Sequence, residues 1–354
     1  MSGDPSIGGV WFPAVRAHSG TDVFTVRLAR ALQARGVRTE ITWLPSRAEY
    51  CPWSVGIPAP PRWASVAHVT SWLHPRFFPG SLRVLSTIHF CVHDRLYQPY
   101  KSLIQKFYHS FWIRLVERSN LSRSSVISAV SGYTARQTER VFRISPIRVI
   151  HNGIPLNGPF QMRLRAEPHH PFRLLYVGNW SRRKGVDLLA PLMTRLGRDF
   201  ELWFTADRRN GHLPYRLPDN CRCIGRLSRE DELSRIYRKA DALLFPSRLE
   251  GFGLVAAEAM ACGLPVIAVR TTSLPEVVDH GRSGILCARH DVSELAAACE
   301  SLRQDPPRWR AMQEASRRRV EQVFSENAMV ENYLRVYQSA ICGAASAVRR
   351  RGRQ

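Results

Sequence analysis

Short apolar runs alternate with amphipathic stretches along the whole chain. The first run, residues 7–15, is followed by a polar loop and then by a stretch in which Phe24, Leu28 and Leu32 share one helical face. This alternation is typical of βαβ units, in which helices cover a buried parallel sheet. We predict further buried strands at 83–88, 125–130, 147–150, 173–178, 201–206, 221–225, 242–246, 265–269 and 284–287.

The length of 354 residues predicts two domains, because single hydrophobic cores stop growing below that size. The segment 152–171 is rich in proline, glycine and polar residues, and we interpret it as the linker. We therefore predict domains at 1–155 and 156–320. The remaining segment, 321–354, has a helical pattern and ends in a basic tail.

The formal net charge is +22, and nearly all of the basic residues are arginine. Such a charge indicates an anionic partner, which would be a nucleic acid, an acidic membrane surface or a phosphorylated substrate. A simpler explanation is a genome that favours arginine codons, because the arginines are spread along the chain. Both explanations stay open at this point.

The cysteines and the apolar stretches bear on the cellular setting. The eight cysteines form no C-x-x-C pair and no zinc-finger spacing, which predicts reduced thiols in a cytosolic protein. The N-terminus lacks the basic region of a signal peptide. Glu258 and Pro265 interrupt the longest apolar stretch, so we expect no membrane span. The prediction is a cytoplasmic protein.

One glycine loop opens an apolar helix, at a place suited to binding. Gly251, Phe252 and Gly253 follow a predicted strand, and the helix begins at Leu254. In open parallel sheets ligands bind beyond the carboxyl ends of the strands. The free N–H groups at the start of such a helix suit a diphosphate.

Two acids, Glu250 and Glu258, bracket this loop and the first turn of the helix. Glu258 could accept two hydrogen bonds from the diol of a ribose, and Glu250 could bind hydroxyls of a second ring. The alternative is a pair of surface acids that flank a core helix. The apolar surroundings favour the binding role, because a buried acid needs a partner.

Cations follow another predicted strand. Arg182, Arg183 and Lys184 stand directly before Gly185, at a turn where they could neutralise a leaving diphosphate. A solvated basic turn is the alternative. The sequence has no D-x-D pair to hold a divalent metal against a diphosphate, so we predict no metal.

A histidine ends the predicted strand at 83–88. His89 could position a substrate or share a proton, and His93 follows shortly after. A packed or merely exposed histidine is the alternative for either residue. The sequence leaves open which of the two points into a cleft.

Taken in order, these motifs resemble the retaining glycosyltransferases of family four. The likeness is sharpest at 246–268, where Glu250 and Glu258 match the family's E-x7-E element. The segments 86–89 and 149–154 also resemble family strands and turns, and the likeness runs over nearly the whole chain. It implies the α/β architecture called GT-B, in which two Rossmann-like domains with parallel sheets face each other across a cleft. The first domain would hold the acceptor, the second the nucleotide-sugar donor, and the C-terminal helix would pack back on the first.

The resemblance also implies roles for individual residues. The first acid and the loop amides would contact the donor sugar, the second acid the ribose, and a lysine with an arginine the diphosphate. The family's arginine position holds Asn179 here, so Arg182 or Arg183 would supply that charge. His89 would be the active-site histidine with Gly20 facing it, and His93 is the second choice. The expected catalytic residues are His89, Lys184 and Glu250, and the expected donor-binding residues are Gly20, Asn179, Arg182, Arg183, Lys184, Glu250, Gly251, Phe252, Gly253, Leu254 and Glu258.

The predicted function is therefore a retaining, metal-independent hexosyltransferase without a cofactor. Its donor would be a UDP- or GDP-linked sugar, and its acceptor a glycan or a lipid-linked molecule in bacterial cell-surface polysaccharide biosynthesis. The segment 93–119 mixes aromatic and basic residues, which suits a helix on the anionic inner face of the membrane or a core helix with a basic face. Two alternatives remain, a nucleic-acid-binding protein on charge alone and a catalytically silent relative on account of Asn179.

Overall fold

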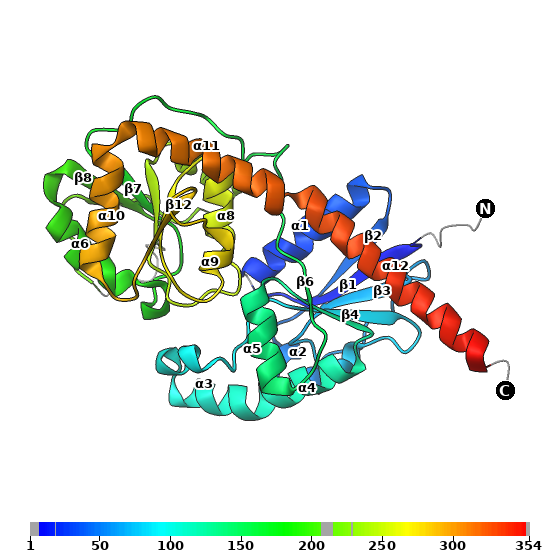
Figure 1. Ribbon diagram of the computed structural model, residues 1–354. Coiled ribbons are helices and arrows are strands. Elements are labelled where there is room, and N and C mark those ends of the chain that lie inside the picture. Colours follow the sequence, from blue (N-terminus) through cyan, green and yellow to red (C-terminus); the bar gives the residue numbers. More distant parts are fainter. Residues whose placement is uncertain (1–6, 18, 207–214, 228, 352–354) are drawn as a thin grey trace. The chain divides into compact units, whose positions relative to one another are not determined.

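The computed structural model describes residues 7–17, 19–206, 215–227 and 229–351, with side chains to Cys342. The chain forms two compact α/β units, each with its own sheet (Figure 1). Unit 1 comprises Met1–Gly153 and Glu326–Gln354, and unit 2 comprises Ile154–Ser325. The chain therefore passes between the units twice. The described residues do not include His18, which stands before Ser19 and Gly20. They also do not include Asp207 or the end of the basic tail.

Unit 1 is built on a six-stranded parallel sheet in the order β2-β1-β3-β4-β5-β6. Its strands are β1 (Gly9–Val15), β2 (Arg38–Leu44), β3 (Val66–Thr70), β4 (Arg83–Ile88), β5 (Val126–Ala129) and β6 (Arg148–Val149). Its helices are α1 (Gly20–Ala34), α2 (Arg47–Tyr50), α3 (Leu103–Tyr108), α4 (Arg114–Arg123), α5 (Gly132–Phe142) and α12 (Glu326–Arg351). Short 3-10 segments lie at η1 (Pro52–Ser54), η2 (Pro75–Phe77) and η3 (Arg95–Tyr100), and a π-helical turn, η4, at His109–Ile113.

Both faces of this sheet are covered, as its apolar strands require. Val10 and Phe12 pack in one cluster with residues of α1 and α12, while Trp11 between them packs in another with Ala48 of α2. This is the alternation of side chains expected along a strand.

Unit 2 has a second six-stranded parallel sheet in the order β12-β11-β10-β7-β8-β9. Figure 1 shows it between α6 and α10 on one side and α8 and α9 on the other. The strands are β7 (Phe172–Tyr176), β8 (Phe200–Phe204), β9 (Cys221–Cys223), β10 (Ala242–Phe245), β11 (Val266–Val269) and β12 (Gly284–Cys287). The helices are α6 (Leu189–Leu196), α7 (Glu230–Tyr237), α8 (Leu254–Ala261), α9 (Leu274–Val277), α10 (Val292–Gln304) and α11 (Pro306–Val323), with 3-10 turns at η5 (Arg182–Lys184), η6 (Val186–Leu188) and η7 (Gly197–Asp199).

The sequence-based prediction of two Rossmann-like units is confirmed, and every strand that it placed is present. Two strands of unit 1 escaped it. The strand β2 lies at the edge of the sheet and is only partly buried, and β3 carries His68 at its centre, so neither reads as an apolar run.

The segment 152–171, interpreted as a linker, packs on unit 2 over most of its length. Phe160 is fully buried, and the guanidinium of Arg165 donates to the carbonyl of Ala240 at 2.8 Å and to the carboxylate of Asp241. The segment is therefore a packed, hydrogen-bonded part of unit 2 rather than a loose connection.

The final helix, α12, is anchored in unit 1 by a buried polar network. His68 of β3 is hydrogen-bonded through Nδ1 to the hydroxyl of Tyr337 at 2.6 Å and through Nε2 to the hydroxyl of Thr87 at 2.7 Å. Burial, with a smaller contribution from nearby His89, lowers the pKa of His68 to about 3, so the imidazole is neutral at pH 7. A neutral imidazole has one N–H and one lone pair, and the two hydroxyls satisfy both.

We expect Tyr337→Phe to lower the free energy of unfolding by about 1 to 3 kcal/mol, because it leaves Nδ1 of His68 buried without its partner. Urea unfolding followed by tryptophan fluorescence measures the change. Tyr50→Phe is the matched control, because the Tyr50 side chain is exposed. Equal stability of the two variants would contradict a stabilising role for the network.

Candidate functional site

The candidate site lies where the strand order of unit 2 reverses. From β7 the chain proceeds to β8 and β9 on one side, and then returns to place β10, β11 and β12 on the other. The switch therefore falls between β7 and β10, which are neighbours in the sheet. In such sheets the crevice beyond the carboxyl ends of these two strands is the usual ligand site. The loops that leave these strands carry the predicted basic residues and the predicted acids.

A buried arginine that sequence reasoning missed joins these two loops. Arg248 donates to both carboxylate oxygens of Asp187, at 2.7 and 2.9 Å, and to the carbonyl of Arg182 at 2.5 Å. Its own backbone N–H donates to the carbonyl of Arg183 at 2.9 Å. The side chain is almost fully buried, so it serves to hold the loops rather than to face solvent. Hydrogen bonding and the charge of Arg248 outweigh the effect of burial and lower the pKa of Asp187.

Gly185 allows the two loops to approach each other closely. It has φ of +76°, and a Cβ atom there would lie 2.3 Å from the carbonyl oxygen of Pro246. Only glycine fits both the left-handed backbone and the contact. The sequence pattern of three cations before a glycine is therefore a packing requirement as well as a source of charge.

Lys184 and Glu250 form an ion pair across the switch point. Lys184 Nζ lies 2.5 Å from Glu250 Oε1, and both side chains are largely buried. Burial raises the pKa of Glu250, but the charges of Lys184 and Arg183 outweigh it and the net shift is downward. Glu250 is therefore a carboxylate at neutral pH, suited to accepting hydrogen bonds rather than to donating a proton.

The loop from Glu250 to Gly253 is fixed by its backbone. The hydroxyl of Ser273 donates to the carbonyls of Glu250 and Phe252, at 3.2 and 3.0 Å. The N–H of Glu250 donates to the hydroxyl of Thr272 at 3.1 Å. This arrangement fixes the path by which the chain enters α8.

Gly253 is the N-cap residue of α8 and has φ of +104°. The helix begins at the next residue, Leu254, and no side chain of the cap covers its first amides. A Cβ atom on Gly253 would lie 3.0 Å from a methyl group of Leu274. The residue before it, Phe252, is buried against Phe324, with ring centroids 5.4 Å apart. The loop is rigid at the point where a diphosphate would meet the helix amides.

Glu258 lies on α8, and the hydroxyl of Tyr237 donates to its Oε2 at 3.2 Å. Both predicted acids are buried, at 9% exposure for Glu250 and 5% for Glu258. The alternative that they are surface acids is therefore wrong. The packing of α8 against α11 explains why the rest of this helix is apolar on every side.

The neutral residue at the family's arginine position is exposed. The backbone carbonyl of Asn179 accepts a hydrogen bond from the hydroxyl of Tyr176 at 3.1 Å. Of the three nearby cations, Arg182 is exposed, and Arg183 donates to the carbonyl of Leu249 at 2.9 Å. Unit 2 thus brings together the loop residues 179–184 and the loop residues 248–254.

Two of the predicted site residues, Gly20 and His89, belong to unit 1. Gly20 is the first residue of α1, and Ser19 caps that helix. His89 follows β4 directly, and its ring lies edge-on to Phe24, with centroids 4.6 Å apart. Burial lowers its pKa to about 4, and its buried Nε2 has no hydrogen-bond partner among the described residues.

The alternative histidine is already paired. His93 Nε2 lies 2.9 Å from a carboxylate oxygen of Glu117, whose other oxygen accepts from Ser71 at 2.8 Å. This buried arrangement favours His89 as the histidine that is free to meet a ligand.

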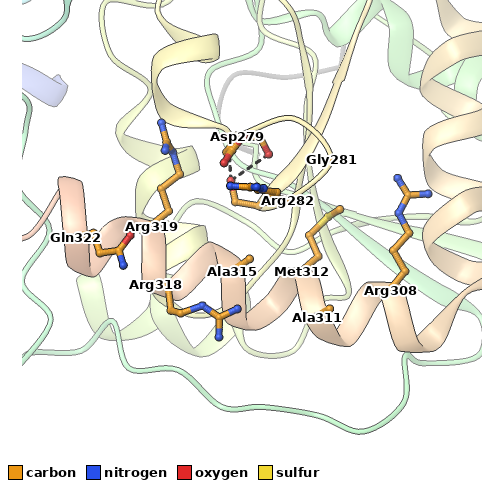
Figure 2. Close-up of a pocket in the computed structure, with 11 residues that line it drawn as sticks. Asp279, Gly281, Arg282, Arg308, Ala311, Met312, Ala315, Arg318, Arg319 and Gln322 are labelled. Carbon is orange, nitrogen blue, oxygen red and sulfur yellow. Dashed lines mark hydrogen bonds between the residues drawn. The ribbon is translucent and has the colours of Figure 1, made fainter.

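A different cavity of unit 2 does not coincide with the candidate site. Figure 2 shows it between α11 and the loop that contains Asp279 and Arg282, with a volume of about 470 Å³. Arg319 there donates to the carbonyls of Glu276 and Val277, and Arg318 pairs with Glu314. None of the predicted site residues lines it.

The described part of the chain contains neither a candidate metal site nor a candidate membrane span. No group of three or more His, Cys, Asp or Glu residues there could hold a metal ion. None of the helices described is both long and apolar enough to cross a membrane.

Comparison with solved structures defines the class of fold. The structure matches sucrose-phosphate synthase from Thermosynechococcus elongatus with a TM-score of 0.76 and 22% identity, over 94% of this chain and 99% of that one. It matches HepE from Anabaena, solved in complex with UDP, with a TM-score of 0.69 and 14% identity, over 94% of this chain and 100% of that one. The fold is that of the GT-B glycosyltransferases.

Comparison with protein families then places the chain. Residues 171–305 match the family of glycosyl transferases group 1, and residues 61–157 match glycosyltransferase family 4. The glycogen synthase of Mycobacterium tuberculosis is 33% identical over 210 residues, which are 56% of this chain and 49% of that protein. The chain thus spans about half the length of this curated relative. It belongs to the family-4-type glycosyltransferases.

We expect Gly185→Ala to lower the free energy of unfolding by about 2 to 4 kcal/mol, because a methyl group would push the loop away from Pro246. Gly225→Ala is the matched control, since Gly225 has a similar φ of +81° and open space around it. The control should cost about 1 kcal/mol from backbone strain alone. Urea unfolding compares them, and equal losses would mean that the close approach to Pro246 is unimportant.

Proposed function

We propose that this protein is a glycosyltransferase that moves a hexosyl group from a nucleotide-sugar to an acceptor hydroxyl. Unit 2 would hold the donor and unit 1 the acceptor. The observation that carries the proposal is the buried Lys184–Glu250 pair at the topological switch point, next to the start of α8. A paired lysine, a carboxylate and the start of a helix at this edge of the sheet meet the needs of a sugar diphosphate.

Each group has a proposed task that follows from its charge. Lys184 and Arg183 neutralise the diphosphate as it leaves, together with the amides at the start of α8. Glu250, ionised by its neighbours, accepts hydrogen bonds from hydroxyls of the transferred sugar. Glu258 accepts the ribose hydroxyls, and Tyr237 orients its carboxylate from the other side. With Asn179 at the family's arginine position, Arg182 is the remaining exposed cation of this loop.

The donor and the acceptor are proposed as classes. The complex of HepE with UDP supports a nucleotide-sugar donor. We propose that the nucleotide is UDP or GDP, and that the acceptor is a glycan or a lipid-linked molecule in cell-surface polysaccharide synthesis. His89 of unit 1, whose low pKa keeps it neutral, would position the acceptor or the sugar.

We further propose retention of the anomeric configuration without a metal or another cofactor. The acceptor would attack the face from which the phosphate leaves, and the leaving phosphate would take its proton. The anomer of the product, read by NMR, tests retention. Unchanged turnover in the presence of EDTA would support independence of metal, and loss of turnover that Mg²⁺ or Mn²⁺ restores would refute it.

The deciding experiment is a thermal-shift screen of the full chain with UDP- and GDP-sugars, followed by an assay for transfer with the sugar that binds. A specific shift together with product formation supports the proposal. Binding and donor hydrolysis without any product, across glycan and lipid-linked acceptors, would identify a catalytically silent relative. The absence of any shift with every nucleotide-sugar would overturn the donor site itself.

For the donor that binds, we expect Lys184→Met to lower kcat/KM by a factor on the order of 10² to 10³, because the leaving diphosphate loses a buried cation. Lys239→Met is the matched control, as it removes an exposed lysine of the same unit, and it should leave kcat/KM unchanged. Steady-state kinetics measures both variants, with thermal unfolding to check that each is folded.

Glu250→Ala should abolish transfer with donors that still bind, since the carboxylate that meets the sugar is gone. Full transfer by this variant would refute the assignment of Glu250.

Glu258→Gln should mainly weaken donor binding, by about tenfold, because a ribose hydrogen bond is lost while the diphosphate site is kept.

A further inference from the structure

A continuous helical rod in unit 1 carries an apolar face that the protein does not bury. The rod runs through α3, the π turn η4 and α4, from Leu103 to Arg123, and is drawn in cyan in Figure 1. Five large apolar side chains on it are between 59% and 83% exposed. They are Leu103, Ile104, Phe107, Phe111 and Leu115, here called the apolar stripe.

The spacing of the stripe keeps it on one face. Leu103, Phe107, Phe111 and Leu115 follow one another every four residues. In an α-helix that spacing drifts slowly around the axis. The wider π turn at 109–113 reduces the drift, so the later residues stay in line with the earlier ones. The rings of Phe107 and Phe111 lie 4.5 Å apart, which confirms that they are neighbours on the surface.

The opposite face of the rod is the one that holds it in unit 1. Ile113 and Val116 are buried, and the amide of Asn120 donates to the carbonyls of Thr70 and Leu73, at 3.0 and 2.9 Å. Glu117 joins through its bonds to Ser71 and His93. The core is therefore complete without the stripe, and packing within unit 1 does not explain it.

Exposed aromatic residues extend the stripe sideways. The indole N–H of Trp112 donates to the carbonyl of Glu49 at 2.8 Å, which fixes α2 beside the rod. The ring of Trp53 lies 5.7 Å from that of Trp112, and Trp53 and Tyr50 are both exposed. Tryptophan and tyrosine are the side chains that favour the boundary between lipid and water.

The exposed charges of the segment 93–123 are of one sign. The neighbouring acid of α2, Glu49, is partly buried and accepts a hydrogen bond from the hydroxyl of Tyr108 at 3.3 Å. Between 93 and 123 the acids are Asp94 and Glu117, and both are buried with hydrogen-bond partners. The exposed charged side chains of the same segment are all arginine: Arg95, Arg114, Arg118 and Arg123. An apolar stripe bordered by cations is complementary to a surface that offers both acyl chains and negative charge.

We propose that this face docks unit 1 on the surface of an anionic phospholipid bilayer. The stripe enters the boundary of the acyl chains, and the arginines meet the headgroups. Such a helix lies in the plane of the interface and does not span it. A second copy of the chain fits this face less well, because a two-fold contact would bring the same arginines together.

The inference concerns unit 1 alone and does not depend on the donor site of unit 2. Its test is flotation of the full chain with two kinds of vesicle, one of phosphatidylcholine alone and one of equal parts phosphatidylcholine and phosphatidylglycerol. We expect binding to the anionic vesicles that weakens as salt is raised. Phe107→Gln and Phe111→Gln should each lower the partition coefficient about tenfold, because each removes a large apolar group from the interface.

Matched controls distinguish docking through the apolar stripe from non-specific binding to vesicles. Leu164→Gln removes a 53% exposed leucine of unit 2 and should leave vesicle binding unchanged. Arg114→Gln with Arg118→Gln should reduce binding to the anionic vesicles and flatten its salt dependence. Light scattering of the wild type without lipid measures its molar mass in solution, and so tests whether a second copy of the chain covers the stripe.

Three results would overturn the proposal. They are no binding to anionic vesicles at low salt, binding that Phe107→Gln and Phe111→Gln leave intact, and a dimer in solution that those variants dissociate. Hydrogen exchange of the wild type keeps the test independent of variant folding, since vesicles should protect amides in and around 103–115. A donor titration of the same variants should be unchanged, so a failure here stays distinct from a failure of the donor site.

Discussion

The arrangement of the two site loops in unit 2 depends on one buried cation, Arg248. Arg248 ties the loop after β10 to the loop after β7, through Asp187 and two backbone groups of the basic turn. Arg248 therefore fixes the backbone of the turn that carries Lys184, and Lys184 forms the ion pair with Glu250. Burying a charge costs free energy that its partners must offset. Both Nη atoms of Arg248 are paired, whereas its buried Nε has no hydrogen-bond partner among the described residues, so moving either loop would remove the contacts that stabilise the guanidinium. These contacts hold Lys184 and Glu250 in place without a ligand, as the proposed stabilisation of a departing diphosphate requires.

Much of the fold could be predicted because parallel strands buried on both faces appear as apolar runs. The exceptions have physical causes. The strand β3 places His68 in the core, and the hydroxyl that satisfies it comes from Tyr337, far along the chain. A pairing of that kind leaves no local signal. The apolar pattern also could not show that 154–171 packs on unit 2, since the partners of Phe160 and Arg165 lie far along the chain, at Tyr237 and Ala240.

In the candidate site, too, the residues in local motifs could be predicted, and those defined by tertiary contacts could not. Residues in contiguous motifs, such as Glu250 and Gly253, could be named from spacing, and the burial of both acids agrees with a binding role. Arg248 lies two positions before Glu250 and gave no such signal, because its partner Asp187 belongs to another loop. The choice between His89 and His93 needed Glu117, which is close to His93 only in the folded chain. Spacing could name the groups proposed to meet a ligand, and only tertiary contacts show the groups that hold them in place.

The division of the chain has a consequence for its synthesis. Unit 1 is completed by α12, whose tyrosines enter the core beside β3 and β4, yet this helix is made only after the whole of unit 2. While the ribosome produces unit 2, the sheet of unit 1 must wait with the surface beneath α12 uncovered. Unit 2, being continuous, can fold first. Premature termination shortly after Ser325 would then release a folded second unit attached to an unfinished first one.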